Sequence, residues 1–94
     1  MARAYLEIKF LENLDRSEEI AKESLQIFQD YNRQKLEAAA RKLLGEIYLQ
    51  RAQQNQPSAE TVAIQFFTES LQIYRELDLT EKAVEVKQLI FVNQ

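Results

Sequence analysis

The 94-residue sequence predicts an all-α fold, built as an antiparallel array of helical hairpins with about five helices. Good helix formers (Ala, Leu, Glu, Gln, Lys and Arg) dominate the composition. Gly45 and Pro57 are the only members of the two residue types that most often interrupt helices. Apolar residues also recur at spacings of three and four, the period of an amphipathic helix. The length suits one small domain, residues 1–94, or a piece of a larger repeat array.

The first two helices are expected over residues 2–13 and 15–31. Asp15 is the expected N-cap of the second helix, because Glu18 follows three residues later as in a capping box. A short polar turn at residues 32–34 should end this helix. Its apolar stripe consists of Ile20, Ala21, Leu25, Phe28 and Tyr31.

The third and fourth helices are expected over residues 35–54 and 59–77. The segment between them contains Asn55 and Pro57 and is the strongest break in the chain. Ser58 could cap the fourth helix, or Pro57 could occupy its first turn. The fourth helix is the most apolar and carries apolar residues on more than one face, which predicts neighbours on both sides.

The fifth helix is expected over residues 78–92, with Asp78 as its N-cap and Glu81 three residues later. Four apolar residues follow one another from Leu89 to Val92. Consecutive positions point about 100° apart around a helix, so at least one of the four should be exposed. We therefore expect a partner surface here, either a homodimer contact or the seat of a further repeat. Its residues would be Ile90, Phe91 and Val92.

An internal repeat gives the strongest single signal in the chain. The segment Glu23–Phe28 recurs 46 residues later as Glu69–Tyr74, with five identities and one aromatic exchange in six positions. Weaker similarity continues in the pairs Asp30 and Glu76, Ala38 and Val84, Arg41 and Lys87, Leu43 and Leu89, and Leu44 and Ile90. The repeated unit is a pair of antiparallel helices, present about two and a half times. Stacked pairs share a continuous core that one pair cannot form alone.

Two motifs carry a family resemblance. The segment from Leu44 to Tyr48 reads L-G-x-x-Y, and Ala63, Phe67 and Ser70 follow the spacing A-x-x-x-F-x-x-A with Ser in the last place. The chain thus resembles the tetratricopeptide repeat family, in its longer-unit bacterial form. The resemblance implies right-handed superhelical stacking of the hairpins. The resemblance also explains why a glycine stands inside a helix at position 45, since glycine is useful where a neighbouring backbone comes close.

The resemblance further implies a non-catalytic interaction module that binds a peptide or helix of a protein partner on the concave face. The groove residues would be Ala39, Lys42, Glu46, Leu49, Gln50 and Gln88, and Val92 would extend the groove. Lys9 and Phe10 would line its other end. A simpler interpretation makes these polar residues a solvated helix face. A different class of function also stays open, namely a structural or oligomerisation domain that self-associates through the apolar C-terminal helix.

The composition argues against several other classes of function. Without Cys or His the chain cannot form a disulfide, a Cys/His zinc site or a His-dependent nucleophile. Acidic pairs such as Glu18 and Glu19 are ordinary on helix surfaces, so we expect no enzyme, no metal and no cofactor. The net charge of −3 disfavours nucleic-acid and membrane partners. The absence of Cys fits a reducing compartment, so the expected location is cytoplasmic.

Overall fold

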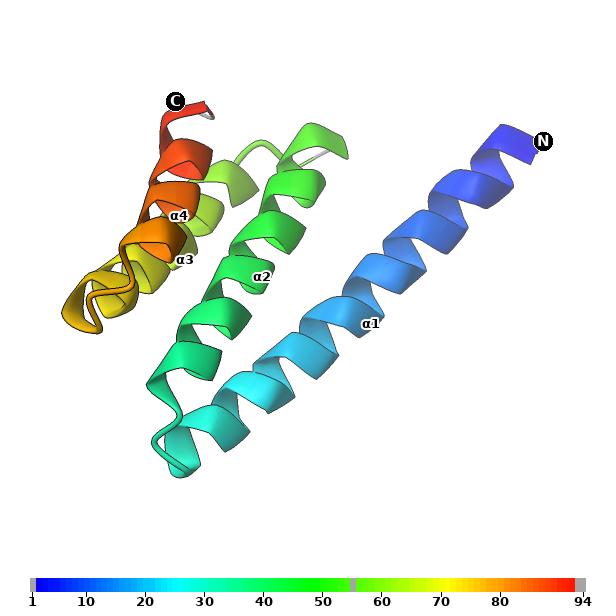
Figure 1. Ribbon diagram of the computed structural model, residues 1–94. Helices are drawn as coiled ribbons and strands as arrows, with labels where there is room; N and C mark the ends of the chain where they lie inside the picture. Colours follow the sequence, from blue (N-terminus) through cyan, green and yellow to red (C-terminus); the bar gives the residue numbers. More distant parts are fainter. Residues whose placement is uncertain (1, 55, 93–94) are drawn as a thin grey trace.

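The computed structural model describes the backbone of residues 2–54 and 56–92, and side chains from residue 12 onward within these ranges. The described chain is all-α and contains no strand, as predicted. It forms four helices: α1 (Ala2–Asp30), α2 (Gln34–Gln54), α3 (Ala59–Glu76) and α4 (Thr80–Val92). Each helix packs against the next one along the chain, and α1 and α4 lie at the two ends of the resulting row (Figure 1).

The expected boundary between residues 2–13 and 15–31 is wrong, because α1 runs through it without interruption. Asp15 is therefore not an N-cap. Its carboxylate instead accepts a hydrogen bond from Arg51 of α2 at 2.6 Å. The two acidic residues of the capping-box pattern bind side chains of another helix and not the backbone N–H groups of a helix end. No Gly or Pro interrupts the helix here. For the same reason the described chain has four helices and not the expected five.

The polar turn expected at residues 32–34 is confirmed, and its backbone geometry explains how α1 ends. Asn32 adopts a left-handed conformation with φ of 55°. Its N–H donates to the carbonyl of Gln29 at 3.2 Å, and the N–H of Arg33 donates to the carbonyl of Phe28 at 2.8 Å. This pair of bonds is a Schellman motif, in which Asn is one of the few residues besides Gly that tolerate the left-handed position.

The end of α3 has the same geometry, 46 residues later. Asp78 has φ of 57°, and its N–H donates to the carbonyl of Arg75 at 3.0 Å. The N–H of Leu79 donates to the carbonyl of Tyr74 at 2.9 Å. The prediction that Asp78 caps the last helix is therefore wrong, since Asp78 terminates the preceding helix and α4 begins at Thr80.

The break around Pro57 is confirmed as the connection between α2 and α3. Ser58 stands at the N-cap position of α3, but it has helical φ and ψ and its side chain makes no capping bond. The backbone alone forms the turn, through bonds from the N–H of Ala59 to the carbonyl of Gln56 and from the N–H of Glu60 to the carbonyl of Pro57.

The larger of two apolar clusters lies where α2, α3 and α4 meet. It contains Ala38, Ala63, Phe67, Leu71, Tyr74, Ala83 and Val86, with Tyr48, Leu49, Ile73, Leu79, Leu89 and Ile90 packed around it. Because α3 contacts both α2 and α4, the expectation of neighbours on two sides of this helix is confirmed. A smaller cluster joins α1 to α2 and contains Leu14, Ala21, Leu44 and Ile47.

The close approach expected at Gly45 is present, but a side chain makes it rather than a backbone. A Cβ atom at Gly45 would stand 2.6 Å from Cε1 and 2.7 Å from Cδ1 of Phe67, well inside contact distance. The ring of Phe67 is fully buried. Gly45 therefore leaves the space on α2 that this ring from α3 occupies.

Candidate partner-binding surfaces

A hollow of about 430 Å³ lies between α2 and α4 and brings together half of the predicted groove residues. Lys42 and Glu46 of α2 line it together with Gln88 of α4. Val92, the expected extension of the groove, lines it as well.

The other three predicted groove residues do not line this hollow. Leu49 packs against the large core and is half-buried. Ala39 and Gln50 are exposed on α2 outside the hollow. Lys9 and Phe10, named for the far end of the groove, fall among the side chains that the structure does not describe.

Sequence reasoning missed Glu85 and Leu89, which complete the lining of the hollow. A signal for Glu85 was present, because Glu85 stands 46 residues after the predicted groove residue Ala39. Its carboxylate lies 3.7 Å from the ammonium group of Lys42, so these two charges pair across the hollow. Glu46 has no ion pair within the described chain, which leaves one carboxylate in the hollow uncompensated.

The three predicted self-association residues of α4 fall into two groups. Phe91 and Val92 are 65% and 81% exposed, whereas Ile90 is half-buried and packs against the large core. Val84, Lys87 and Gln88 join Phe91 and Val92 around a shallow hollow of about 480 Å³. The ammonium group of Lys87 lies 5.8 Å from the centre of the Phe91 ring, which forms a cation–π contact. The outer side of α4 is thus an apolar surface edged by one cation.

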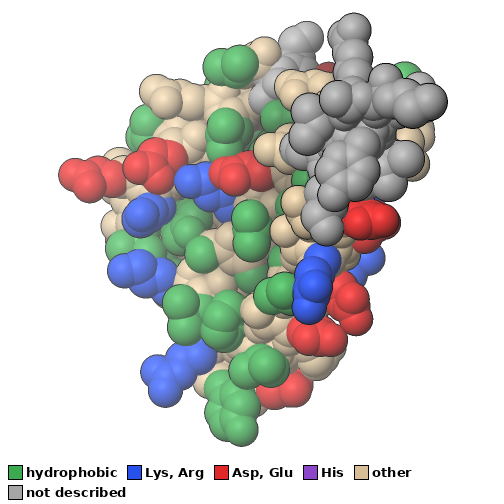
Figure 2. All heavy atoms as spheres, turned by 90° about the vertical axis from the view of Figure 1, so that its right-hand side faces the viewer, with side chains coloured by type: hydrophobic (Ala, Val, Ile, Leu, Met, Phe, Trp, Pro, Cys, Tyr) green, Lys and Arg blue, Asp and Glu red, His purple; other side chains and the backbone are tan. Residues whose placement is uncertain are grey.

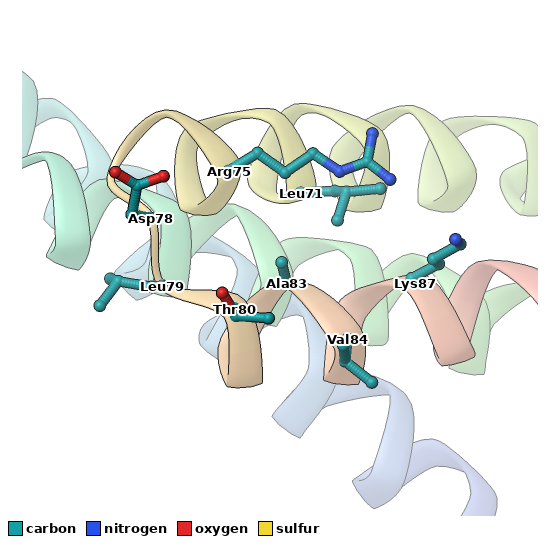
Figure 3. Close-up of a pocket in the computed structure, with 8 residues that line it drawn as sticks. All are labelled: Leu71, Arg75, Asp78, Leu79, Thr80, Ala83, Val84 and Lys87. Atoms are coloured by element: carbon teal, nitrogen blue, oxygen red, sulfur yellow. The ribbon is translucent and has the colours of Figure 1, made fainter.

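A further hollow of about 290 Å³ lies between the end of α3 and the start of α4 (Figure 3). Arg75 lines it from α3, and Asp78 and Thr80 line it from the turn and the first residue of α4. Figure 3 shows Ala83 directed toward α3 and Val84 directed away from it. Val84 therefore belongs to the outer side of α4.

An exposed apolar stripe on α1 was not predicted as a surface. Ile20, Ile27 and Tyr31 are each more than half exposed. Their spacing of seven and four places them on one face of the helix, and Figure 2 shows hydrophobic side chains gathered in a band on this side of the molecule. Ile20 and Tyr31 were expected in the packing stripe. Ala21 and Leu25 make the contact with α2 instead, because α1 stands at the end of the row and, among the described helices, packs mainly against α2.

A polar network closes the contact between α1 and α2. The guanidinium of Arg51 lies 2.6 Å from the carboxylate of Asp15 and 3.1 Å from that of Glu18. The hydroxyl of Tyr48 donates to Glu18, and the ammonium of Lys22 lies 3.2 Å from the same carboxylate. Arg51 and Glu18 are largely buried, with side chains 11% and 18% exposed. The Nε of Arg51 is buried without a hydrogen-bond partner among the described atoms.

This network shifts the pKa values of its members. Burial raises the pKa of Glu18, but the hydrogen bond from Tyr48 and the charges of Lys22 and Arg51 outweigh it, so the pKa lies below the ordinary 4.5. Burial, together with the bond to Glu18, raises the pKa of the Tyr48 hydroxyl. Both groups therefore hold the protonation states that the bond between them requires.

Two further observations concern the described residues as a whole. They contain no group of three or more acidic side chains placed to hold a metal ion. None of the helices, as far as they are described, is long and apolar enough to cross a bilayer.

Comparisons with models of known protein families, with curated proteins and with solved structures found no match.

Proposed function

We propose that the chain is a non-catalytic protein-interaction module that holds a segment of a partner protein between α2 and α4. The observation that carries this proposal is the hollow that joins Lys42 and Glu46 of α2 to Gln88 of α4. The family resemblance implies Lys42 and Glu46 as groove residues, and the 46-residue offset of the repeat adds Gln88, which corresponds to Lys42. The proposed binding needs no cofactor and no reaction.

A tetratricopeptide-like architecture is part of the proposal. The two Schellman ends at Asn32 and Asp78 support it, because they repeat at the sequence offset of 46 residues. The A-F-S residues of α3 support it as well, since Ala63, Phe67 and Ser70 are all fully buried. Right-handed superhelical stacking of the hairpins follows from the resemblance and is proposed on that basis.

The charges in the hollow suggest the chemistry of the partner segment. Lys42 is paired with Glu85, whereas Glu46 has no ion pair within the described chain. A partner that places Lys or Arg beside Glu46 would gain a charge-assisted hydrogen bond. Val92 lies at the same hollow and is mostly exposed, so it offers an apolar contact next to that charge. We therefore propose a partner segment with a basic residue close to an apolar one.

The test uses displayed peptides of random sequence, selected on the wild-type protein and then measured individually by calorimetry. We expect selected peptides to share a basic residue and to lose most of their affinity for Glu46→Lys. Glu19→Lys is the matched control, because Glu19 is exposed on α1 and the substitution changes the charge equally. The proposal fails if peptides bind Glu46→Lys as tightly as wild type, or if both charge reversals weaken binding alike.

Self-association through α4 is the second candidate function. The observation that favours it is the exposure of Phe91 and Val92 on the outer side of the helix. Phe91→Glu should abolish self-association and leave peptide binding in the hollow intact, whereas Glu46→Lys should do the reverse. Sedimentation equilibrium and the peptide measurement together separate the two candidates.

A further inference from the structure

Beside the contact of Phe67 with Gly45, α3 packs on α2 through one continuous stripe. The Phe66 ring stacks on Tyr48 with ring centres 5.6 Å apart, and the hydroxyl of Ser70 donates to the carbonyl of Ala38 at 2.8 Å. The stripe continues through Ile73, which packs on the large core, to Leu77, which lies beside the start of α2. These four residues, the last of which is the C-cap of α3, follow one another at spacings of four, three and four. Next to the stripe, Glu69 pairs with Arg41 of α2.

The exposed stripe of α1 is the counterpart of this buried stripe. Subtracting 46 from Phe66, Ser70, Ile73 and Leu77 gives Ile20, Ser24, Ile27 and Tyr31. The counterpart of Glu69 is Glu23, which is exposed and has no partner within the described chain. α1 thus carries the residues for an α3-like contact; Ser24 is half-buried, and the other three are exposed in the part of the chain that the structure describes.

The outer side of α4 is in turn the counterpart of the surface with which α2 receives α3. Adding 46 to Ala38, Arg41 and Gly45 gives Val84, Lys87 and Phe91, and all three are exposed. Val84 points away from α3, as it must to receive a further helix (Figure 3). These two surfaces belong to α1 and α4, the helices at the two ends of the row (Figure 1).

We propose that the α1 stripe of one copy docks on the outer side of α4 of a second copy, in the manner in which α3 docks on α2 within each chain. This inference rests on the second candidate function, self-association, and names its partner surface. It is independent of the hollow between α2 and α4.

Charge supports this pairing. Glu23 of one copy meets Lys87 of the next, as Glu69 meets Arg41 within the chain. Both side chains are exposed in the single chain and so are accessible to a second copy.

The proposed contact joins two different surfaces, so it is head-to-tail. Each copy that joins leaves one free α1 stripe and one free α4 surface, and association therefore continues beyond a dimer unless the rotation closes a ring. A symmetric dimer through α4 alone would instead stop at two chains. The number of chains in the largest assembly therefore distinguishes the head-to-tail contact from a symmetric dimer through α4.

The test measures the mass distributions of two blocked variants by sedimentation equilibrium, up to millimolar concentration. Phe91→Glu blocks the α4 surface, and Ile27→Glu blocks the α1 stripe. Both sites are exposed, so both variants should keep the wild-type circular dichroism and melting temperature. We expect wild type to exceed two chains as concentration rises and each variant alone to stay at 11.1 kDa. Their equimolar mixture should form 1:1 heterodimers and stop, because only one functional α1–α4 pair remains.

Gln65→Glu, an exposed position on the far side of α3, is the matched control and should associate as wild type does. The inference is overturned if wild type remains monomeric, if Ile27→Glu still dimerises, or if the mixture gives no heterodimer. Dimerisation of Ile27→Glu together with loss in Phe91→Glu would leave self-association standing as a symmetric α4 contact. If a blocked variant loses its fold, Glu23→Lys and Lys87→Glu replace it. Each alone should weaken association, and their mixture should restore it.

Discussion

Helix α2 is packed on two sides, and the two contacts are built differently. Toward α3 and α4 it meets a core that contains two buried aromatic rings, Phe67 and Tyr74. Toward α1 it meets a small aliphatic cluster, closed by the network around Arg51 and Glu18. Apolar burial contributes roughly in proportion to area and is insensitive to pH, whereas an ion pair depends on protonation and on salt. The contact of α2 with α3 and α4 should therefore keep its stability as pH and salt change. The contact of α2 with α1 should depend on both.

The largest expected effect comes from Phe67→Ala. Phe67 is fully buried in the contact of α3 with its neighbours, so its truncation should lower the free energy of unfolding by about 3–5 kcal/mol. Urea unfolding followed by circular dichroism measures this. A loss below about 1 kcal/mol would show that the core collapses around the missing ring and that α3 does not depend on it.

Arg51→Met is expected to cost about 2 kcal/mol, between the values for exposed and for buried ion pairs, because Arg51 and Glu18 are largely but not fully buried. The loss should fall on the contact between α1 and α2. Hydrogen exchange should accordingly rise in the part of α1 beside Arg51 and stay unchanged in α3. Uniformly faster exchange would mean that the two contacts of α2 are not separable.

The same network predicts a dependence on pH. The pKa of Glu18 is lowered in the folded state, so its contribution is complete above the unfolded pKa, near 4.5, and is lost as pH falls below that value toward the folded pKa. Wild type should therefore lose more stability than Glu18→Gln, which lacks the titrating carboxyl group, between about pH 7 and about pH 3. Urea midpoints at both pH values test this, and equal losses would contradict the proposed role of the ion pair.

Gly45→Ala should destabilise the contact between α2 and α3 by about 1 kcal/mol, since overpacking of about 1–3 kcal/mol is partly offset by about 1 kcal/mol of helix propensity. The added methyl group would meet the buried ring of Phe67 at 2.6 Å. In a Phe67→Leu background the same substitution should cost less or become stabilising. A double-mutant cycle of melting temperatures checks the coupling, and strictly additive effects would exclude it.

The smallest effect is expected for Ser70→Ala, about 0.5–1.5 kcal/mol, because it removes one buried hydrogen bond to the carbonyl of Ala38. Ser24→Ala is the matched control 46 residues earlier, where no such bond exists within the described chain. At low concentration, where the chain is monomeric, Ser24→Ala should leave the urea midpoint unchanged. If both substitutions cost the same, the hydrogen bond is not the cause.

The sequence was sufficient for the helical class and for most helix ends, because local signals determine them. The polar turn after α1 and the break at Pro57 need no distant partner. Asp15 and Asp78 were misassigned because Asp serves equally well at an N-cap, in a left-handed turn and in an ion pair. Only the position of Arg51, 36 residues away, shows which role Asp15 has.

Some residues of the candidate surfaces could likewise be predicted from the sequence, and others could not. Lys42 and Glu46 follow from the family resemblance, whereas Gln88 and Glu85 follow from the 46-residue register of the repeat. The exposure of Ile20 and Tyr31 could not be read from their spacing, because a buried and an exposed apolar stripe have the same period. Exposure depends on whether another helix follows in the row, and the sequence pattern does not encode that.

Most contacts between the described helices join neighbours in the chain, and this has a consequence for folding kinetics. Contacts between adjacent helices are local in sequence, and such topologies fold fast. The hairpin of α2 and α3 contains the ring of Phe67 on Gly45, so we expect it to form first, with α1 and α4 adding from either side. Substitutions at Phe67 should then slow folding, whereas substitutions at Arg51 should mainly accelerate unfolding.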